Sequence, residues 1–127
     1  MTDPALADRI DELAASARAD HAAFEPPAEP PDEERAMGYL RDGFGQAVWC
    51  YVDARTNGFD HIDPDDFTAL EGAMNRWLAL YAQCYGYDIE ADVTIRKAAE
   101  LLLETHNVRD TAQMLTHVPD RNESLGT

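Results

Sequence analysis

The sequence has a single lysine, Lys97, together with two cysteines and two serines among its 127 residues. Cys50 and Cys84 are too few for the disulfide scaffold that stabilises small secreted domains, and we expect both to be buried thiols. The four histidines lack the H-x-x-x-H and H-E-x-x-H spacings of zinc sites, and there is no C-x-x-C. No glycine-rich loop precedes Lys-Ser or Lys-Thr, and the serines, Ser16 and Ser124, lie in terminal regions. The sequence therefore gives no support to a transition-metal site, a phosphate-binding loop or a Ser- or Cys-based catalytic set, and we expect no cofactor.

A long apolar run is also missing. A membrane helix needs about 18 apolar residues, and each candidate stretch is interrupted by Arg or Glu. Residues 1–9 do not combine a basic segment with an apolar one, as a secretory signal does. We therefore expect a soluble cytoplasmic protein, and the chain length favours one domain with one core.

Acidic residues, in contrast, are abundant. There are 25 Asp and Glu against 10 Lys and Arg, which gives a formal net charge of −15. Carboxylates hold water and tolerate crowding once strong salt shortens the screening length to about 3 Å. With Ala, Asp and Arg in excess and almost no lysine, the composition resembles that of proteins from extreme halophiles such as the haloarchaea. The resemblance implies a solvated acidic surface suited to strong salt, and no motif identifies a functional family.

Apolar periodicity predicts helices along the chain, and no segment is typical of a strand. Asp3 and Pro4 begin a helix that ends near residue 23. The prolines of residues 26–31 form a stiff spacer. We therefore expect residues 1–25 to form an N-terminal helical arm that packs either on its own bundle or on a second copy.

A helical bundle is predicted for residues 32–119, followed by a polar tail at 120–127. Its first helix covers about 33–56 and contains Gly38, Gly43 and Gly45, each of which weakens a helix by about 1 kcal/mol. Gly38 and Gly45 are seven residues apart, which favours a close helix crossing on their side. A break near Gly43 is the alternative.

Three further helices complete the bundle. One starts at Asp63 and Pro64, with Asp66 in the capping-box position, and its wide aromatic stripe is typical of a core. The others start at Ile95 and after an N-cap at Asn107. The fold class is an all-α bundle of four to five helices, and the predicted core comprises Phe44, Val48, Tyr51, Leu70, Trp77, Tyr81, Leu102 and Leu115.

Residues 53–67 resemble part of an EF-hand calcium loop. With Asp53 at position 1, Asn57 and Gly58 fall on positions 5 and 6, but Arg55 occupies position 3 and Pro64 position 12. A turn between two helices explains the same residues, so we predict no metal site. Weak cation binding is the alternative, by Asp53, Asn57, Asp60 and Asp66.

Arg55 and His61 match the Arg-x(4–6)-His spacing of HEPN domains, which are all-α ribonucleases of similar length. The resemblance implies that Arg55 stabilises the phosphate and that His61 transfers a proton. Thr56 stands where most such motifs have Asn, Asp or His, and a turn intervenes. An RNase is therefore an alternative hypothesis.

Residues 94–121 resemble a helix-turn-helix, although Leu103 stands where that motif has alanine. The negative charge gives nucleic-acid binding no support, because phosphate contacts contribute little affinity in strong salt. In this alternative, the side chains facing the groove are Arg109, Gln113, Thr116, His117 and Arg121.

By elimination, we favour a non-catalytic protein-interaction or regulatory module over an enzyme. The expected partner is another protein or a second copy of the chain, with no membrane involved.

Overall fold

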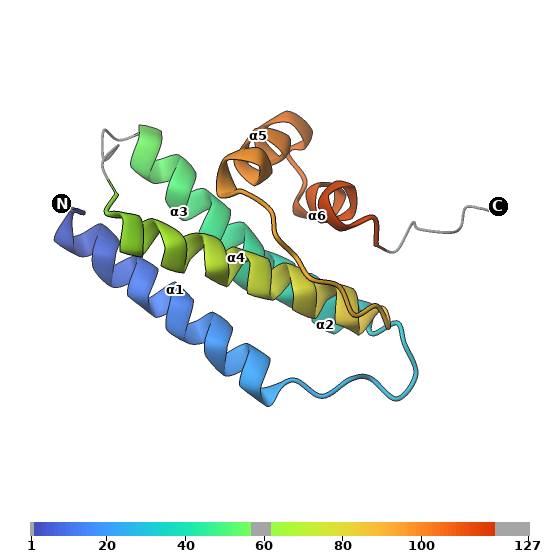
Figure 1. Cartoon of the computed structure of the whole chain (residues 1–127). Helices are drawn as coiled ribbons and strands as arrows, with labels where there is room; N and C mark the ends of the chain where they lie inside the picture. The colour runs from blue at the N-terminus through green and yellow to red at the C-terminus, as the bar shows by residue number, and fades with distance from the viewer. Residues whose placement is uncertain (1, 57–61, 119–127) are drawn as a thin grey trace.

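The computed structural model describes residues 2–56 and 62–118, which form an all-α bundle without strands, as predicted (Figure 1). The second, third and fourth helical elements follow one another without a gap. Counted as one, they bring the number of separate helices in the described residues to five. None of the helices in these two ranges is long and apolar enough to cross a membrane. In chain order the elements are α1 (Pro4–Ala23), α2 (Glu33–Tyr39), the π-helical segment η1 (Leu40–Phe44), α3 (Gly45–Thr56), α4 (Pro64–Cys84), α5 (Ile95–Thr105) and α6 (Val108–Thr116).

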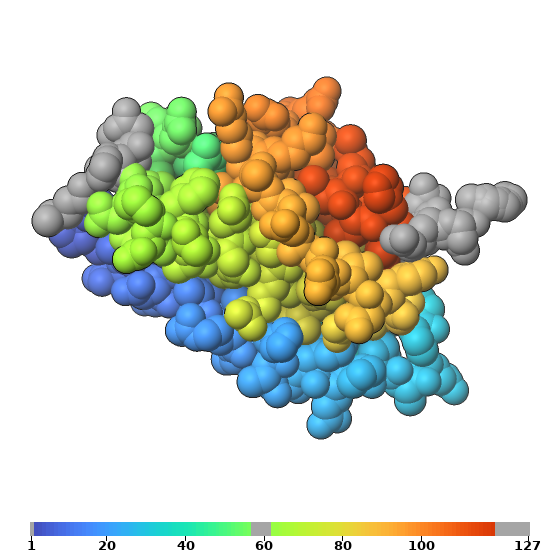
Figure 2. Space-filling model, viewed as in Figure 1, coloured from blue at the N-terminus to red at the C-terminus, as the bar shows by residue number. Residues whose placement is uncertain are grey.

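The helix α4 lies at the centre of the bundle. Helix α1 packs mainly on α4, and α2, η1 and α3 pack on another side of it. Helices α5 and α6 pack on α3 and η1, away from α1 (Figure 1). In the space-filling view, the atoms of α1 lie directly against those of α4 (Figure 2). The molecule thus has α1 on one side, the α2–η1–α3 and α4 helices in the middle, and α5 and α6 on the other side.

The helices α1 and α4 run in the same direction, as two hydrogen bonds between them show. At one end the backbone N–H of Asp63 donates to Thr2 Oγ1 at 2.7 Å. Farther along both helices, in their C-terminal halves, the indole Nε1 of Trp77 donates to Asp20 Oδ2 at 2.8 Å. The buried face of α1 consists of Leu6, Ile10, Ala14 and Ala17. The helix expected to be an arm therefore lies on its own bundle and contributes to the core.

The aromatic stripe of α4 forms the centre of the core, as predicted. Trp77, Tyr81, Leu70 and Met74 are at most 1% exposed. Of the eight predicted core residues, Tyr51 and Leu115 are only half-buried and pack at the edge of the cluster. Large apolar side chains at the helical period thus supply most of the buried apolar area.

The predicted limits of α4 are confirmed. The helix begins at Pro64, and Gly86 follows its end with a φ of 89°, a conformation that glycine adopts without strain. The expected capping box is not formed, because the Asp63 side chain makes no capping hydrogen bond.

The close approach of two helices occurs at Gly43. A Cβ atom there would lie 2.4 Å from Trp77 Cδ2, so only glycine fits against the indole ring. The crossing predicted from Gly38 and Gly45 is wrong at Gly38, where an added Cβ would have no atom within 4 Å. The alternative, a break near Gly43, corresponds to the π-helical segment η1, which includes Gly43 and interrupts the α-helical geometry between α2 and α3. At Gly45 an added Cβ would lie 3.2 Å from Val108 Cγ1.

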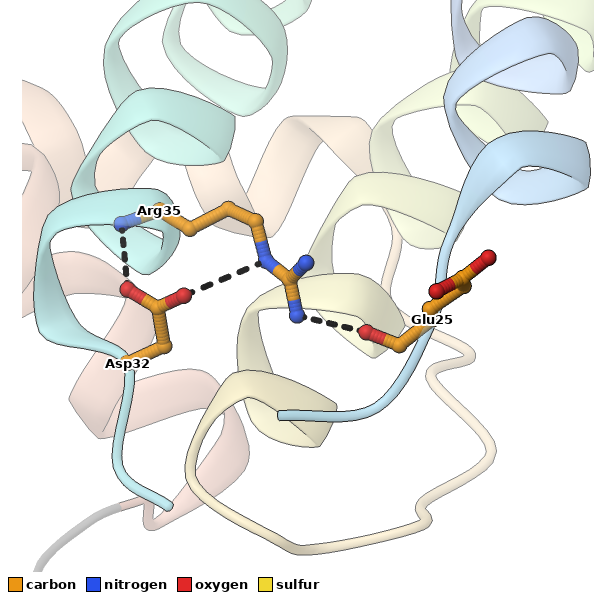
Figure 3. A network of polar contacts seen from close by, with 3 residues as sticks. All are labelled: Glu25, Asp32 and Arg35. Atoms are coloured by element: carbon orange, nitrogen blue, oxygen red, sulfur yellow. Dashed lines mark hydrogen bonds and ion pairs between the residues drawn. The ribbon is translucent and has the colours of Figure 1, made fainter. Parts of the chain in front are cut away.

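A polar network holds the proline spacer at both ends (Figure 3). Beyond the spacer, the Arg35 backbone N–H donates to Asp32 Oδ1 at 3.2 Å, and Arg35 Nε lies 3.6 Å from Asp32 Oδ2. Arg35 Nη2 then reaches back to donate to the Glu25 carbonyl at 2.7 Å. The Asp32 N–H also donates to the Cys84 carbonyl at 2.8 Å, which ties the spacer to the end of α4. These bonds favour packing of α1 on its own chain.

Candidate functional site

The helices α5 and α6 form a hairpin with a connection of only two residues. His106 ends α5 in the left-handed region with a φ of 57°, and the Asn107 side chain begins α6 by accepting from the Asp110 N–H at 2.9 Å. The hydroxyl oxygens of Thr105 and Thr111 lie 2.9 Å apart and join the two helices. These bonds give partners to several of the backbone groups that helix ends leave unpaired, which stabilises the turn between the two helices.

The start of the hairpin is attached to α4. The Asn75 side-chain amide donates to the Val93 carbonyl at 2.9 Å, and its oxygen accepts from the Val93 N–H at 2.8 Å. Two residues further on, Glu71 Oε2 accepts from the Ile95 N–H at 2.8 Å. These bonds hold the chain that enters α5 along the surface of α4.

The end of the hairpin is attached to the same helix. The Tyr81 hydroxyl donates to the Val118 carbonyl at 2.7 Å. Burial raises the pKa of Tyr81, so its phenol keeps the proton that this bond requires. An exposed ion pair of 3.7 Å between Arg109 Nη2 and Glu33 Oε2 connects α6 to α2. The hairpin is therefore attached to α4 at both ends and to α2 through α6.

Three large apolar side chains are exposed in the described residues, and they lie on three adjoining helices. Trp49 on α3 is 41% exposed, Leu103 on α5 is 48% exposed, and Met114 on α6 is 49% exposed. Helix α5 contacts both α3 and α6. We call this region the α3–α5–α6 surface and define it by these three residues.

Charged side chains flank two of these apolar residues, Leu103 and Met114. On α5, Arg96, Glu100 and Leu103 have the i, i+4, i+7 spacing of one helix face, and Arg96 Nε lies 3.7 Å from Glu100 Oε2. On α6, Asp110 stands one turn before Met114. An apolar centre with a polar rim is the ordinary composition of a protein–protein interface.

The sequence did not identify this surface, although α5 contains a signal for it. Residues 101–103 are three consecutive leucines. Successive helical residues are about 100° apart, so one helix face cannot bury all three. Leu102 is 2% exposed and Leu103 points outward. The position of Trp49 needed the tertiary structure, because its helix contacts others on several sides.

The helix-turn-helix alternative stays a prediction, and its proposed reading residues are not all on the surface. Thr116 is 6% exposed, and its hydroxyl donates to the Ala112 carbonyl at 2.7 Å, so it cannot face a groove. Arg109 is paired with Glu33. Gln113 is half-buried and His117 is exposed at the end of α6, whereas Arg121 lies outside the described residues.

The ribonuclease alternative stays a prediction. Arg55 lies in the last turn of α3, where Nη1 donates to the Tyr51 hydroxyl at 3.5 Å and the guanidinium lies 5.9 Å from the Tyr51 ring centroid. His61 lies outside the described residues, so the structure does not bring the pair together or separate it.

The weak cation alternative also stays a prediction. Asp53 is exposed near the end of α3, and Asp66 is half-buried in the first turn of α4. Asn57 and Asp60 fall outside the described part of the chain. Within residues 2–56 and 62–118, no group of three or more His, Cys, Asp and Glu side chains is placed to hold a metal ion.

The two cysteines are free and buried, as predicted. Burial raises the pKa of the Cys50 thiol, and the nearby Arg9 offsets this effect only in part. Burial likewise raises the pKa of Cys84, against a smaller opposite effect of Arg35. Both thiols are therefore protonated at neutral pH, which makes them weak nucleophiles.

The fold and this surface define a small all-α protein in which α3 and the α5–α6 hairpin carry exposed apolar side chains. The model of a domain of unknown function, DUF8055, matches residues 4–120, and the chain belongs to this family. The match covers the bundle from α1 through α6. Searches of curated proteins and of solved structures found no match.

Proposed function

We propose that the chain is a non-catalytic protein-interaction module that self-associates through the α3–α5–α6 surface. The supporting observation is that Trp49, Leu103 and Met114 are each at least 41% exposed, on α5 and on the two helices that it contacts, α3 and α6. Full burial of such a side chain contributes about 1.5–3 kcal/mol, so covering the exposed part of three of them favours association.

A second copy of the chain is the simplest partner, because association then needs one surface only. In a two-fold dimer the same surface is used twice, so three exposed side chains become six at one interface. Both copies carry a net charge of −15 and repel each other in dilute salt. Strong salt shortens the screening length to about 3 Å at 1 M, which removes most of this repulsion. Association should therefore increase with KCl concentration.

The same charge supports a working environment in the cytoplasm of an extreme halophile. The 25 acidic residues are opposed by only 10 Lys and Arg, so the folded chain concentrates negative charge that salt must screen. Thermal unfolding in about 0.1 M and about 1 M KCl tests this point. A higher midpoint in the stronger salt is expected, and an equal or lower midpoint would argue against a halophilic protein.

The two thiols give little support to a catalytic role. Cys50 and Cys84 are at most 2% exposed, and burial raises the pKa of each. A nucleophilic cysteine needs access to substrate and a lowered pKa. Both groups fit a structural role better.

The test is sedimentation velocity in about 1 M KCl over a range of protein concentrations. The informative variant combines Trp49→Gln, Leu103→Gln and Met114→Gln, which removes the apolar groups without changing the charge. The control combines Ala15→Gln, Ala19→Gln and Ala22→Gln, at exposed positions of α1.

We expect the wild-type chain and the α1 control to associate and the α3–α5–α6 variant to stay monomeric. A wild-type chain that is monomeric at every concentration would overturn self-association. Equal association of the two variants would show that another surface is responsible.

A further inference from the structure

A hollow between α1 and α4 differs in charge from the rest of the protein. Its volume is about 180 Å³, and no Asp or Glu lines it. Four other surface hollows of the described residues each include at least one Asp or Glu. The residues that line the α1–α4 hollow are Ala14, Arg18, Thr68, Ala69, Gly72, Ala73 and Arg76.

Arg18 and Arg76 have no partner for their side chains within the described residues, by hydrogen bond or ion pair. Elsewhere in the bundle, three other arginines lie within 4 Å of a carboxylate, as the pairs of Arg35, Arg96 and Arg109 show. With acidic residues in such excess, two unpaired arginines beside one hollow leave a local surplus of positive charge.

Small residues form the floor of this hollow. Ala14 and Ala73 are buried where α1 meets α4. A Cβ atom added to Gly72 would have no atom within 4 Å, so there is open space above the backbone. The floor therefore lets a small group approach the helices between the two arginine side chains.

The hollow continues into a wider one of about 670 Å³, because Gly72 and Arg76 line both. The wider part includes Glu90 and Asp92, which disfavour an anion there. It also includes Asn75, whose side-chain amide is already bonded to Val93. The end near Arg18 and Arg76 is thus where negative charge is favoured.

We propose that Arg18 and Arg76 bind a phosphate group in this hollow, with the Thr68 hydroxyl as a further donor. A guanidinium offers a planar pair of N–H donors that matches the oxygens of phosphate. The volume of about 180 Å³ is below the range of about 300–1,000 Å³ for drug-sized ligands, which favours a compact group. The phosphate is free or is the monoester of a small molecule whose remainder extends into the wider hollow.

The test is a titration of isotope-labelled protein followed by amide resonances, with inorganic phosphate in one arm and glycerol phosphate in the other. The informative variants are Arg18→Gln and Arg76→Gln, at exposed positions that leave the core intact. The matched control is Arg41→Gln, which removes the same charge from an exposed position where the side chain also has no described partner.

We expect saturable shifts centred on residues 14–18 and 68–76, with each informative variant weakening the affinity about tenfold and the control leaving it unchanged. Tighter binding of glycerol phosphate assigns the site to a monoester, and tighter binding of inorganic phosphate assigns it to the free ion. Shifts that do not saturate with either probe would overturn the proposal, as would equal weakening by the Arg41 control.

Discussion

The two outer sides of the molecule cover the same middle layer in different ways. On one side α1 buries Leu6, Ile10, Ala14 and Ala17 against its own chain, and no large apolar side chain of α1 is exposed. On the other side the shorter helices α5 and α6 bury part of their apolar surface and leave Leu103 and Met114 about half exposed.

This difference distinguishes apolar surface that stabilises the fold from apolar surface that is available to a partner. The apolar surface of α1 is used within the chain, so changes there should affect stability. The hairpin has apolar surface that the chain itself does not cover, so changes at Leu103 or Met114 should affect association more than stability.

The largest contrast should come from one truncation on each side. Ile10→Ala removes a fully buried side chain and should lower the free energy of unfolding by about 2–5 kcal/mol. Leu103→Ala, at an exposed position, should change it by no more than about 0.5 kcal/mol. Urea unfolding of dilute protein measures both. A small loss for Ile10→Ala would mean that α1 is a detachable arm.

A second contrast uses two glycines of the middle layer. Gly43→Ala places a methyl group 2.4 Å from the Trp77 ring and should destabilise the fold by about 1–3 kcal/mol. Gly38→Ala has open space and should stabilise the helix by about 0.5–1 kcal/mol. Thermal unfolding distinguishes them, and equal effects would contradict the close approach of η1 to α4.

The N-cap residues of α1 and α6 allow a third comparison of the two sides. Asn107→Ala and Asp3→Ala each remove the side chain that caps a helix, at a cost of about 0.5–2 kcal/mol. Only Asn107→Ala should also weaken association, because it loosens the helix that carries Met114. Sedimentation velocity checks this, under conditions in which both variants have the same fraction of folded protein. Equal weakening by Asp3→Ala would remove the distinction between the two sides.

The smallest effect should come from the buried thiols. Burial raises the pKa of Cys50 and Cys84 in the folded protein, so the unfolded chain loses these protons first as pH rises. Their contribution to stability is complete below the ordinary thiol pKa of about 8.5 and decreases above it. The decrease in unfolding free energy between about pH 7 and about pH 9.5 should be smaller in the Cys50→Ala, Cys84→Ala double variant. An unchanged decrease would show that the thiols do not contribute.

Much of the fold could be predicted from local signals in the sequence. Asp63 with Pro64 marked the start of α4, although the Asp63 side chain makes no capping hydrogen bond, and Asn107 with Asp110 marked the start of α6. Such start signals lie in a few neighbouring residues. The aromatic stripe of α4 also identified the centre of the core, since helical periodicity determines which side chains share a face.

The remaining features depend on contacts between distant residues. Nothing local to Gly43 indicates that Trp77 lies against it, so the reason for this glycine needed the tertiary structure. The spacer was predicted as a stiff link, but the bond from Arg35 to the Glu25 carbonyl joins residues on either side of it. The α3–α5–α6 surface was missed for the same reason, since exposure of Trp49 depends on where α5 and α6 pack.

The most direct test of the interaction surface uses methionine methyl groups as probes in about 1 M KCl. Met114 is 49% exposed on the proposed interface, whereas Met74 is fully buried beside Trp77 in the core. As protein concentration rises, the Met114 methyl resonance should shift and become protected from a soluble paramagnetic reagent, with Met74 unchanged. A Met114 methyl that keeps its shift and its accessibility at every concentration would contradict self-association through this surface.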